Sequence, residues 1–471
     1  MSFLHRIANI VDECKNEYED VKRQVSLKAR DEALTGKGYF MLDEEYGKAT
    51  KTTEAEQTFV NLLGYGDNLE FMQFLLTSKG LEGKLDLIYV DPPFYSKADY
   101  NIKLNLKSEK LDKEIKIKQT AYTDNWEGGL EDYLRMITLR LFLMRDLLSS
   151  TGSIWMHLDW HVAHYVKLIM DEIFGADNFV NEVIWNYKSG GTSNRRFARK
   201  HDTLLFYGKT KDYYFDVQKE KSYNRGYKPY HFKGVEEFQD ELGWYTMVNM
   251  KDVWQLDMVG RTSAERTGYA TQKPEALLSR ILSSCTKEGD ICADFFGGSG
   301  TLAAVAGKMN RSWITCDMGA NSIVAQKKRM SKLGEHFQVY KQGALQQEDA
   351  EDCMMQEKNL VVALEEDDSN DQFILSLKEH KPAGCIMDRL KEEDRAVVEE
   401  ALGQDPLCTV DSWSVDYNFD GSVHRPDEIH YREKGKLKDS IEIKKKDVER
   451  KNISIRCLDV WGNEAKEIVK L

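Results

Sequence analysis

The segment that runs from Lys84 to Phe94 constrains the fold of this chain more than any other stretch. It begins with the apolar run Leu85–Val90, which is typical of a buried strand in a parallel sheet. The run ends at Asp91-Pro92-Pro93-Phe94, and two consecutive prolines can neither continue a strand ladder nor enter a helix interior. The chain therefore has to turn at the carboxyl end of this strand, which is where open α/β sheets bind their ligands.

The residues of this turn suit a planar amine. The Asp91 carboxylate and the Pro92 carbonyl are both hydrogen-bond acceptors, and an exocyclic amine offers two N–H donors. The Phe94 ring can stack on a flat base. A plain Asp-Pro turn after a strand is the alternative, and the turn alone does not decide between the two.

A second unit, a strand, a glycine turn, a helix and another strand, lies between residues 289 and 317. The turn is Gly297-Gly298-Ser299-Gly300, and the second strand ends at Asp317, 17 residues beyond Gly300. Glycine lets the backbone approach a ligand closely, a helix N-terminus offers free N–H donors, and an acid at this distance can bind two ribose hydroxyls. This half-Rossmann unit predicts an α/β fold. A dinucleotide would fit the unit too, and the Asp-Pro-Pro-Phe edge favours a methyl donor.

Between these units the hydrophobic pattern predicts alternating helices and strands. Helices are expected near residues 130–152 and 166–174, and strands at 153–158, 183–185 and 203–207. The lysine-rich stretch 95–121 is expected to be a mobile loop or a hairpin over the ligand-binding edge. His157, His161 and His164 lie close together, but no pair has metal-ligand spacing within one element, so no metal is expected.

A basic segment follows, although the net charge of the chain is −13. Residues 186–233 carry twelve Lys/Arg against four Asp/Glu, with eleven aromatic residues interleaved. Cations interleaved with aromatic rings suit contact with phosphates and bases, although such a run can equally be a solvated face. The cations expected to bind DNA are Lys188, Arg195, Arg196, Arg199 and Lys200.

Length and composition set the remaining limits. With 471 residues, of which 41% are hydrophobic, the chain is long enough for two or three domains or for one large α/β domain with additions. No run of 18 apolar residues occurs and the start has no signal-peptide core, so neither a membrane span nor secretion is expected. None of the eight cysteines forms a C-x-x-C pair, which argues against a zinc site or a disulfide framework and predicts a cytoplasmic protein.

The domain organisation is predicted from these patterns. We expect an N-terminal helical segment (1–60), a catalytic half (61–185), a basic and aromatic recognition region (186–267) and a cofactor-binding half (268–345). An acidic helical linker (346–408) and a small β-rich domain (409–471) complete the chain. The last domain is predicted from alternating apolar residues, and the sequence does not indicate its role.

These motifs together resemble a known family, the S-adenosylmethionine-dependent amino methyltransferases of DNA. The Asp-Pro-Pro-Phe turn precedes the Phe296-x-Gly298-x-Gly300 turn, and this circularly permuted order is similar to that of the β class. The resemblance runs from about Asn61 to Gly334, and it is greatest to the adenine-N6 enzymes that serve as modification subunits of type III restriction systems. Its further motifs are Gly66-Asp67-Asn68-Leu69, Asp124-Asn125-Trp126, Gly152-Ser153-Ile154, Asp171–Gly175, Thr271–Glu275 and Asp294–Thr301.

The resemblance implies a role for each matched residue. Asp91 and Pro92, followed by Pro93, would hold the target amine, and Phe94 would stack on the flipped base. The turn from Phe296 to Gly300 would face the methionine portion of S-adenosylmethionine, Asp317 the ribose and Asp67 the adenine ring. Gln272, Lys273 and Pro274 would close over the methionine end. The full cofactor set is Asp67, Asn68, Gln272, Lys273, Pro274, Asp294, Phe295, Phe296, Gly298, Gly300, Thr301 and Asp317.

The resemblance also implies partners, and it leaves alternatives open. Double-stranded DNA, a second copy of the chain and a restriction or helicase subunit are the expected partners. The chain departs from the family at Phe94, where tyrosine is more common, and its recognition region is short for a type III subunit. Transfer to cytosine N4 remains an alternative, although those enzymes usually carry serine where Asp91 stands. A DNA-binding accessory subunit without activity is the other alternative.

Overall fold

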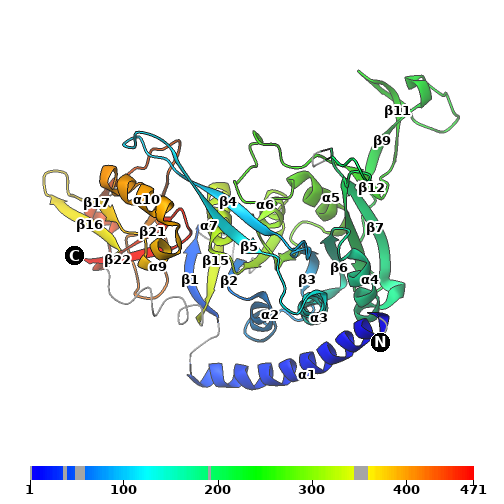
Figure 1. Cartoon of the computed structure of the whole chain (residues 1–471), viewed down its shortest axis with the longest axis horizontal. Helices are drawn as coiled ribbons and strands as arrows, with labels where there is room; N and C mark the ends of the chain where they lie inside the picture. Colours follow the sequence, from blue (N-terminus) through cyan, green and yellow to red (C-terminus); the bar gives the residue numbers. More distant parts are fainter. Residues whose placement is uncertain (1–2, 36–39, 48–58, 189–191, 344–358) are drawn as a thin grey trace.

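The computed structural model of the protein describes residues 3–35, 40–47, 59–188, 192–343 and 359–471 (Figure 1). A ten-stranded sheet in the order β1-β15-β2-β14-β13-β3-β6-β8-β7-β12 forms its centre. The bounds are β1 Phe40–Tyr46, β15 Phe337–Gln342, β2 Asn61–Tyr65, β14 Ser312–Asp317, β13 Ile291–Asp294, β3 Leu85–Val90, β6 Leu148–Leu158, β8 His201–Gly208, β7 Phe179–Asn186 and β12 Val253–Gln255.

The middle of this sheet is parallel, and two distant parts of the chain build it. Strands β15, β2, β14, β13, β3 and β6 run parallel to their neighbours, whereas β1 and β8 pair antiparallel at either side. Strands β13 and β14 come late in the chain yet lie between β3 and β2. The catalytic and cofactor-binding halves predicted from the sequence are thus interleaved in one sheet, in circularly permuted order.

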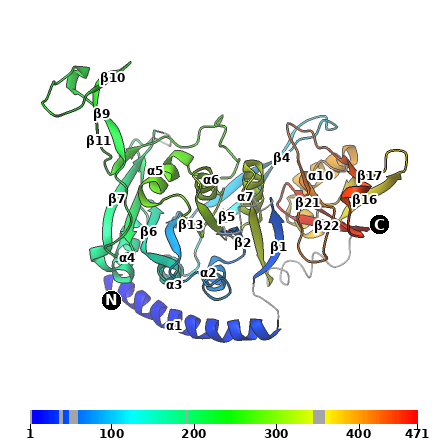
Figure 2. The same ribbon diagram turned by 180° about the vertical axis from the view of Figure 1, so that it is seen from behind.

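Helices cover both faces of the sheet, which makes a three-layer Rossmann-like α/β fold (Figures 1 and 2). One face packs against α2 Asn68–Thr77, α3 Leu130–Leu147 and α4 Ala163–Met170, and α1 Phe3–Thr35 lies outside these helices and packs against them. The other packs against α5 Glu275–Cys285, α6 Thr301–Lys308 and α7 Ala320–Leu333. Within β3, Ile88 and Val90 join the first buried apolar cluster while Leu87 and Tyr89 join the second, so both faces of this strand are buried.

The expected hairpin after Phe94 is present and reaches the C-terminal part of the chain. It consists of β4 Asp99–Leu106 and β5 Ile115–Thr123, which pair antiparallel. Leu104, Leu106 and Ile117 share a buried cluster with residues of the C-terminal module, by which we mean residues 359–471. Trp461 is one of these residues. The hairpin therefore ties the turn at the catalytic edge to that module.

The predicted recognition region contains an arm that projects from the body of the molecule (Figures 1 and 2). It is a small antiparallel sheet of β9 Lys219–Tyr223, β11 Gly243–Asn249 and β10 Phe238–Asp240. Short helical turns lie at Asp171–Gly175, Ala176–Asn178, Arg225–Tyr227 and Lys445–Asp447.

Two predictions about the ends of the chain were wrong. The N-terminal segment is not wholly helical, because Phe40–Tyr46 forms edge strand β1, whose charged residues Asp43, Glu44 and Glu45 are paired with cations. The described part of the expected helical linker begins with two strands, β16 Leu360–Asp367 and β17 Gln372–His380. In both places a run of acids concealed the apolar alternation of a strand.

These two strands belong to the C-terminal module. Strand β17 pairs with β20 Ser440–Lys444, and a second sheet holds β19 Glu428–Tyr431, β18 Val410–Asp416, β21 Asn452–Asp459 and β22 Glu464–Lys470. Helices α9 Gly384–Arg389 and α10 Glu392–Gln404 lie where a helical run was expected. The remainder of the predicted linker, 346–358, lies outside the described residues.

Two further expectations concern cysteines and membranes. Six cysteines are buried free thiols, whereas Cys385 is disulfide-bonded, which the sequence did not lead us to expect. Within the described residues no helix is both long enough and apolar enough to cross a membrane.

Candidate active site

Acidic side chains gather where the parallel strands end. Asp91 follows β3, Asp294 ends β13, Asp317 ends β14, and Asp159 follows β6. Because Asp294 pairs in register with Tyr89 on one side and Thr315 on the other, these strand ends meet at one edge of the sheet. The structure thus brings together the residues predicted for the amine and those predicted for the cofactor.

One oxygen of the Asp91 carboxylate is paired and the other is open. Lys273 Nζ lies 2.5 Å from Asp91 Oδ2, and both side chains are largely buried. Oδ1 is buried and meets no hydrogen-bond partner in the described part of the chain. A buried acceptor without a donor is unfavourable by itself, so this oxygen has the capacity for a donor from a bound substrate. Lys273, predicted to lie over the methionine end of the cofactor, instead orients the carboxylate and lies 5.3 Å from the centre of the Phe94 ring.

A buried polar network that the sequence did not reveal supports Phe94. The His157 ring lies 5.9 Å from the Phe94 ring, centre to centre. His157 Nδ1 is 2.7 Å from the Tyr89 hydroxyl, and Nε2 is 3.2 Å from Asp202 Oδ2. Burial opposes ionisation of Asp202, but the hydrogen bond and charge of His157, together with the charge of Lys273, lower its pKa. Asp202 comes 45 residues after His157, so no local pattern could have linked them.

The glycine turn is organised by the two acids beside it. Asp294 Oδ1 accepts the Phe296 N–H at 2.9 Å, and burial raises the pKa of Asp294 to about 8. Asp317 accepts the Gly298 N–H through Oδ2 and the Gly319 N–H through Oδ1, both at 2.8 Å. Burial also raises the pKa of Asp317. The acids therefore hold the turn open toward the sheet edge.

Asp67 and Asn68 form part of the same edge through α2. Asp67 is the N-cap of this helix. Its Oδ1 accepts the backbone N–H groups of Leu69 and Glu70, which are the contacts that an N-cap aspartate makes. Its other oxygen accepts Arg140 Nη2 at 2.9 Å, and Arg140 was not foreseen. Asn68 Nδ2 donates to the carbonyl of Phe295 at 2.6 Å, which fixes the strand just before the glycine turn.

The segment 271–275 supports the turn from the opposite side. Gln272 accepts the Thr267 N–H at 2.8 Å and donates to the Glu265 carbonyl at 2.7 Å, so it braces its own loop. The Thr301 hydroxyl donates a hydrogen bond to the Lys273 carbonyl at 3.1 Å. This bond connects α6 to the lysine that pairs with Asp91. Pro274 is the N-cap of α5 and directly precedes its first residue, Glu275.

The predicted DNA-binding cations leave the sheet at the same edge. The segment that holds them joins β7 to β8, and its described residues include Arg195 and Arg196, both exposed. Lys188 lies 3.8 Å from Asp257, and Lys200 Nζ donates to the Lys188 carbonyl at 3.5 Å. Arg199 places its guanidinium carbon 3.3 Å from the ring centre of Trp160, a residue that sequence reasoning did not select.

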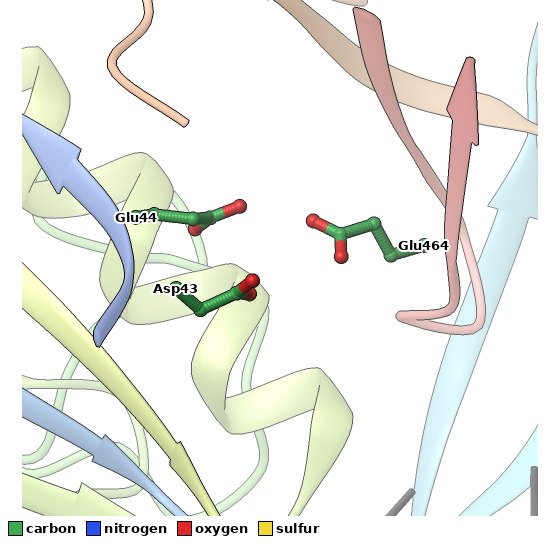
Figure 3. Close-up of side chains that lie close together, drawn as sticks. All are labelled: Asp43, Glu44 and Glu464. Carbon is green, nitrogen blue, oxygen red and sulfur yellow. The ribbon is translucent and has the colours of Figure 1, made fainter. Parts of the chain in front are cut away.

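An acidic cluster elsewhere has the ligands for a metal but is already neutralised. Asp43, Glu44 and Glu464 lie together (Figure 3), and among the described residues they are the one group of such ligands close enough to share an ion. Arg456 contacts all three acids, and Lys327 and Lys466 pair with two acids each. The cluster is therefore an ion-pair network. Two of the three histidines considered above as metal ligands also have hydrogen-bond partners. His157 lies between Tyr89 and Asp202, and His161 bonds Asp159.

The residues at the sheet edge fit S-adenosylmethionine. The Gly298 backbone has φ of +48°, which favours glycine, and a Cβ placed there would meet the Tyr269 ring at 3.4 Å, an ordinary van der Waals contact. Helix α6 starts directly after the glycine turn, and Asp317 retains acceptor capacity for ribose hydroxyls. A Rossmann-like edge with these groups defines a methyltransferase that acts on an amine.

Comparison with known proteins agrees with this class. Residues 85–328, more than half of the chain, match the N6/N4 DNA methylase family. The type II methyltransferase M.HpaI of Haemophilus parainfluenzae is 27% identical over 255 residues, which cover 53% of this chain and 69% of that protein. The type II methyltransferase M.BglII of Bacillus subtilis is 32% identical over 196 residues, covering 39% and 52%.

Solved structures show weaker similarity. The M1.HpyAVI–SAM complex is 18% identical, with a TM-score of 0.36, and the match covers 57% of this chain and 98% of that one. The cytosine-N4-specific PvuII DNA methyltransferase is 14% identical, with a TM-score of 0.39, and the match covers 61% of this chain and 90% of that one. The chain belongs to the DNA methylase family of N6 and N4 amino methyltransferases, and its methyl donor is S-adenosylmethionine.

Proposed function

We propose that this protein transfers a methyl group from S-adenosylmethionine to N6 of an adenine flipped out of double-stranded DNA. The observation that supports this most directly is the open oxygen of Asp91. Oδ1 is a buried acceptor directly after β3, three residues before Phe94 and on the same edge as the glycine turn. An adenine amine would supply the donor that this oxygen lacks.

The carboxylate also favours adenine over cytosine. The cytosine-N4 enzymes that the chain resembles usually carry serine at the position of Asp91. Serine has a single hydroxyl oxygen, whereas Asp91 keeps one oxygen on Lys273 and has the second available for the amine. Cytosine N4 remains the alternative target, because both amines would meet the same acceptors. Identifying the methylated base distinguishes the two.

The reaction that we propose needs positioning more than strong acid–base chemistry. Asp91 Oδ1 and the Pro92 carbonyl would each accept one N–H of the amine, which draws the nitrogen lone pair out of conjugation with the ring. The bound donor supplies an electrophilic methyl group on a sulfonium. The nitrogen–methyl bond forms as the methyl–sulfur bond breaks, and one proton then leaves the nitrogen through its hydrogen bond to Asp91. Lys273 would hold the carboxylate in the orientation that this contact requires.

The partners that we propose follow from the resemblance and from the basic segment. DNA would contact Lys188, Arg195, Arg196, Arg199 and Lys200, which leave the sheet at the catalytic edge. A homodimer, a restriction or helicase subunit of a type III system and a cytoplasmic location are further parts of the proposal. The named relatives reported above are type II methyltransferases, so a type III partner has less support than the chemistry has.

The role of Asp91 is tested by comparing the wild type with Asp91→Ala. Tritium transfer from labelled S-adenosylmethionine to mixed unmethylated DNA should fall by about 10³-fold or more in the variant, because the amine loses its acceptor. Cofactor affinity, measured by calorimetry in parallel, should change by less than about threefold, since the turn at Phe296–Gly300 is untouched. Transfer at the wild-type rate by Asp91→Ala would remove the proposal.

A further inference from the structure

A second aromatic residue leaves the sheet at the same level as the ring predicted to bind the target base. Val90 of β3 pairs in parallel register with Met156 of β6. Phe94 and Trp160 each lie four residues beyond that pair. Both residues therefore follow neighbouring strands at the ligand-binding edge, and the function described so far uses only Phe94.

Trp160 is held in an exposed position rather than buried. It is 43% exposed, although tryptophan usually contributes most of its surface to a core. Its ring lies 3.7 Å from that of His161, centre to centre. His161 is itself fixed, because its backbone N–H donates to Asp159 Oδ1 at 2.8 Å and its ring nitrogen lies 2.7 Å from Oδ2. The chain thus supports a large aromatic surface that faces outward.

A cation of the basic segment covers this ring. The guanidinium carbon of Arg199 lies 3.3 Å from the ring centre, the spacing of a stacked cation–π pair. Arginine binds phosphate oxygens as readily as it stacks, so this side chain has two alternative partners. When a phosphate draws Arg199 away, a flat surface of the indole becomes free for another planar group.

We infer that Trp160 stacks on a DNA base next to the gap left by the extruded adenine, and that Arg199 moves from the ring to the DNA backbone in the same step. This inference rests on the proposed function, since it requires a base to leave the duplex. Extrusion breaks stacking on both sides of the gap, and an indole that stacks on an exposed neighbour offsets part of that loss. Trp160 is a positioning residue in this account, while Asp91 and Phe94 hold the target itself.

The test uses full-length protein and duplex oligonucleotides that carry the site found by sequencing methylated DNA. Trp160→Ala should raise the KM for the matched duplex about tenfold or more, and Trp160→Phe by less, because a smaller ring still stacks. The same duplex with an abasic site beside the target adenine leaves Trp160 no neighbouring base to stack on. On that duplex, Trp160→Ala should recover to within about twofold of the wild type.

A matched control removes a similar pair from the opposite edge. Tyr214 also carries a cation, with Lys287 Nζ 4.5 Å from its ring centre, but its N–H bonds the Thr151 carbonyl near the start of β6. Tyr214→Ala should leave the KM for both duplexes within about twofold of the wild type. Cofactor affinity and melting temperature, measured for every variant, separate a stacking role from a folding defect.

Two results would overturn the inference. One is a Trp160→Ala variant with the wild-type KM for the matched duplex. The other is a loss that persists on the abasic duplex, which would make Trp160 a wall of the target pocket or a part of the fold. Failure of the proposed function looks different, because the wild type would then methylate adenine in neither duplex.

Discussion

Asp294 is the acid that the fold keeps protonated at the centre of the active-site edge. Its side chain is 4% exposed, and burial raises its pKa from 3.8 to about 8, with further upward contributions from Asp91 and Asp317. Near neutral pH the carboxyl is therefore mostly uncharged. This arrangement keeps three adjacent strand-end acids from all carrying charge before the cationic cofactor binds.

The raised pKa of Asp294 predicts a specific dependence of stability on pH. Between about pH 4 and pH 8 the folded protein holds a proton on this carboxyl that the unfolded chain has released, so folding becomes less favourable as pH rises through that window. Asp294→Asn cannot titrate, and its amide oxygen can still accept the Phe296 N–H. We expect the melting temperature of the variant, relative to the wild type, to increase steadily from pH 5 to pH 8. Parallel melting curves across this range would show that Asp294 ionises normally.

At the scale of elements, the glycine turn between β13 and α6 combines two requirements. Gly298 and Gly300 have φ of +48° and +70°, a conformation that favours glycine. The Gly298 N–H also anchors the turn to Asp317. The turn thus needs glycine for its backbone, and we expect a bound cofactor to approach the Gly298 backbone closely, where a side chain would obstruct it.

These two requirements can be separated with a pair of alanine substitutions. Gly298→Ala and Gly289→Ala both place a Cβ at positive φ, +48° and +85°, and neither Cβ meets an atom closer than 3.4 Å. Each should lower stability by about 1–2 kcal/mol through backbone strain. Gly298→Ala alone should weaken S-adenosylmethionine binding, by about tenfold or more in a calorimetric titration. Equal affinities in the two variants would place the cofactor away from this turn.

The elements also show what a sequence can predict here. Asp91 and Asp317 were predicted as site residues because each ends an apolar run typical of a parallel strand, and parallel strands end at one edge, whereas Asp294 was predicted from the family resemblance. Arg140 and Asp202 escaped prediction because only the folded sheet brings them to Asp67 and His157. Tertiary packing alone created those pairs, with no local spacing to reveal them.

Strands with many charged residues were the other elements that could not be predicted from the sequence. In β1 the sequence Phe-Met-Leu-Asp-Glu-Glu-Tyr carries three consecutive acids, and it was assigned to the N-terminal helical segment. Glu44 is nevertheless 1% exposed, because Lys327 and Arg456 reach it from α7 and β21. A charge that a distant cation will pair with cannot be distinguished in sequence from one that water solvates.

For the whole molecule, this buried ion-pair network joins the C-terminal module to the methyltransferase sheet. Arg456 of the module is 5% exposed and lies 2.9 Å from Asp43 and 2.8 Å from Glu44 of β1. The backbone of His424 also hydrogen-bonds β1, donating to the Asp43 carbonyl and accepting the Glu45 N–H. The module is therefore docked on the edge strand of the sheet, where it covers unpaired backbone groups.

The network predicts an unequal cost for two arginines that both bridge to β1. Arg456→Met should lower the unfolding free energy by about 3–5 kcal/mol, because buried acids lose their cation. Arg425→Met should cost less than about 1 kcal/mol, since Arg425 pairs with Glu45 at a side-chain exposure of 46%. Urea unfolding measures both changes, and limited proteolysis should release the module faster only from Arg456→Met. Similar small losses in the two variants would show that the network does not fasten the module.

The measurement that tests the whole account most directly is the identity of the base that the wild-type protein methylates. DNA treated with labelled S-adenosylmethionine is digested to nucleosides, and these are separated and counted. The account predicts label in N6-methyladenine, because Asp91 and Pro92 would hold the adenine amine toward the methyl donor. Label in N4-methylcytosine would keep the fold and the family but contradict the adenine assignment, and the absence of transfer despite cofactor binding would contradict catalysis by this chain alone.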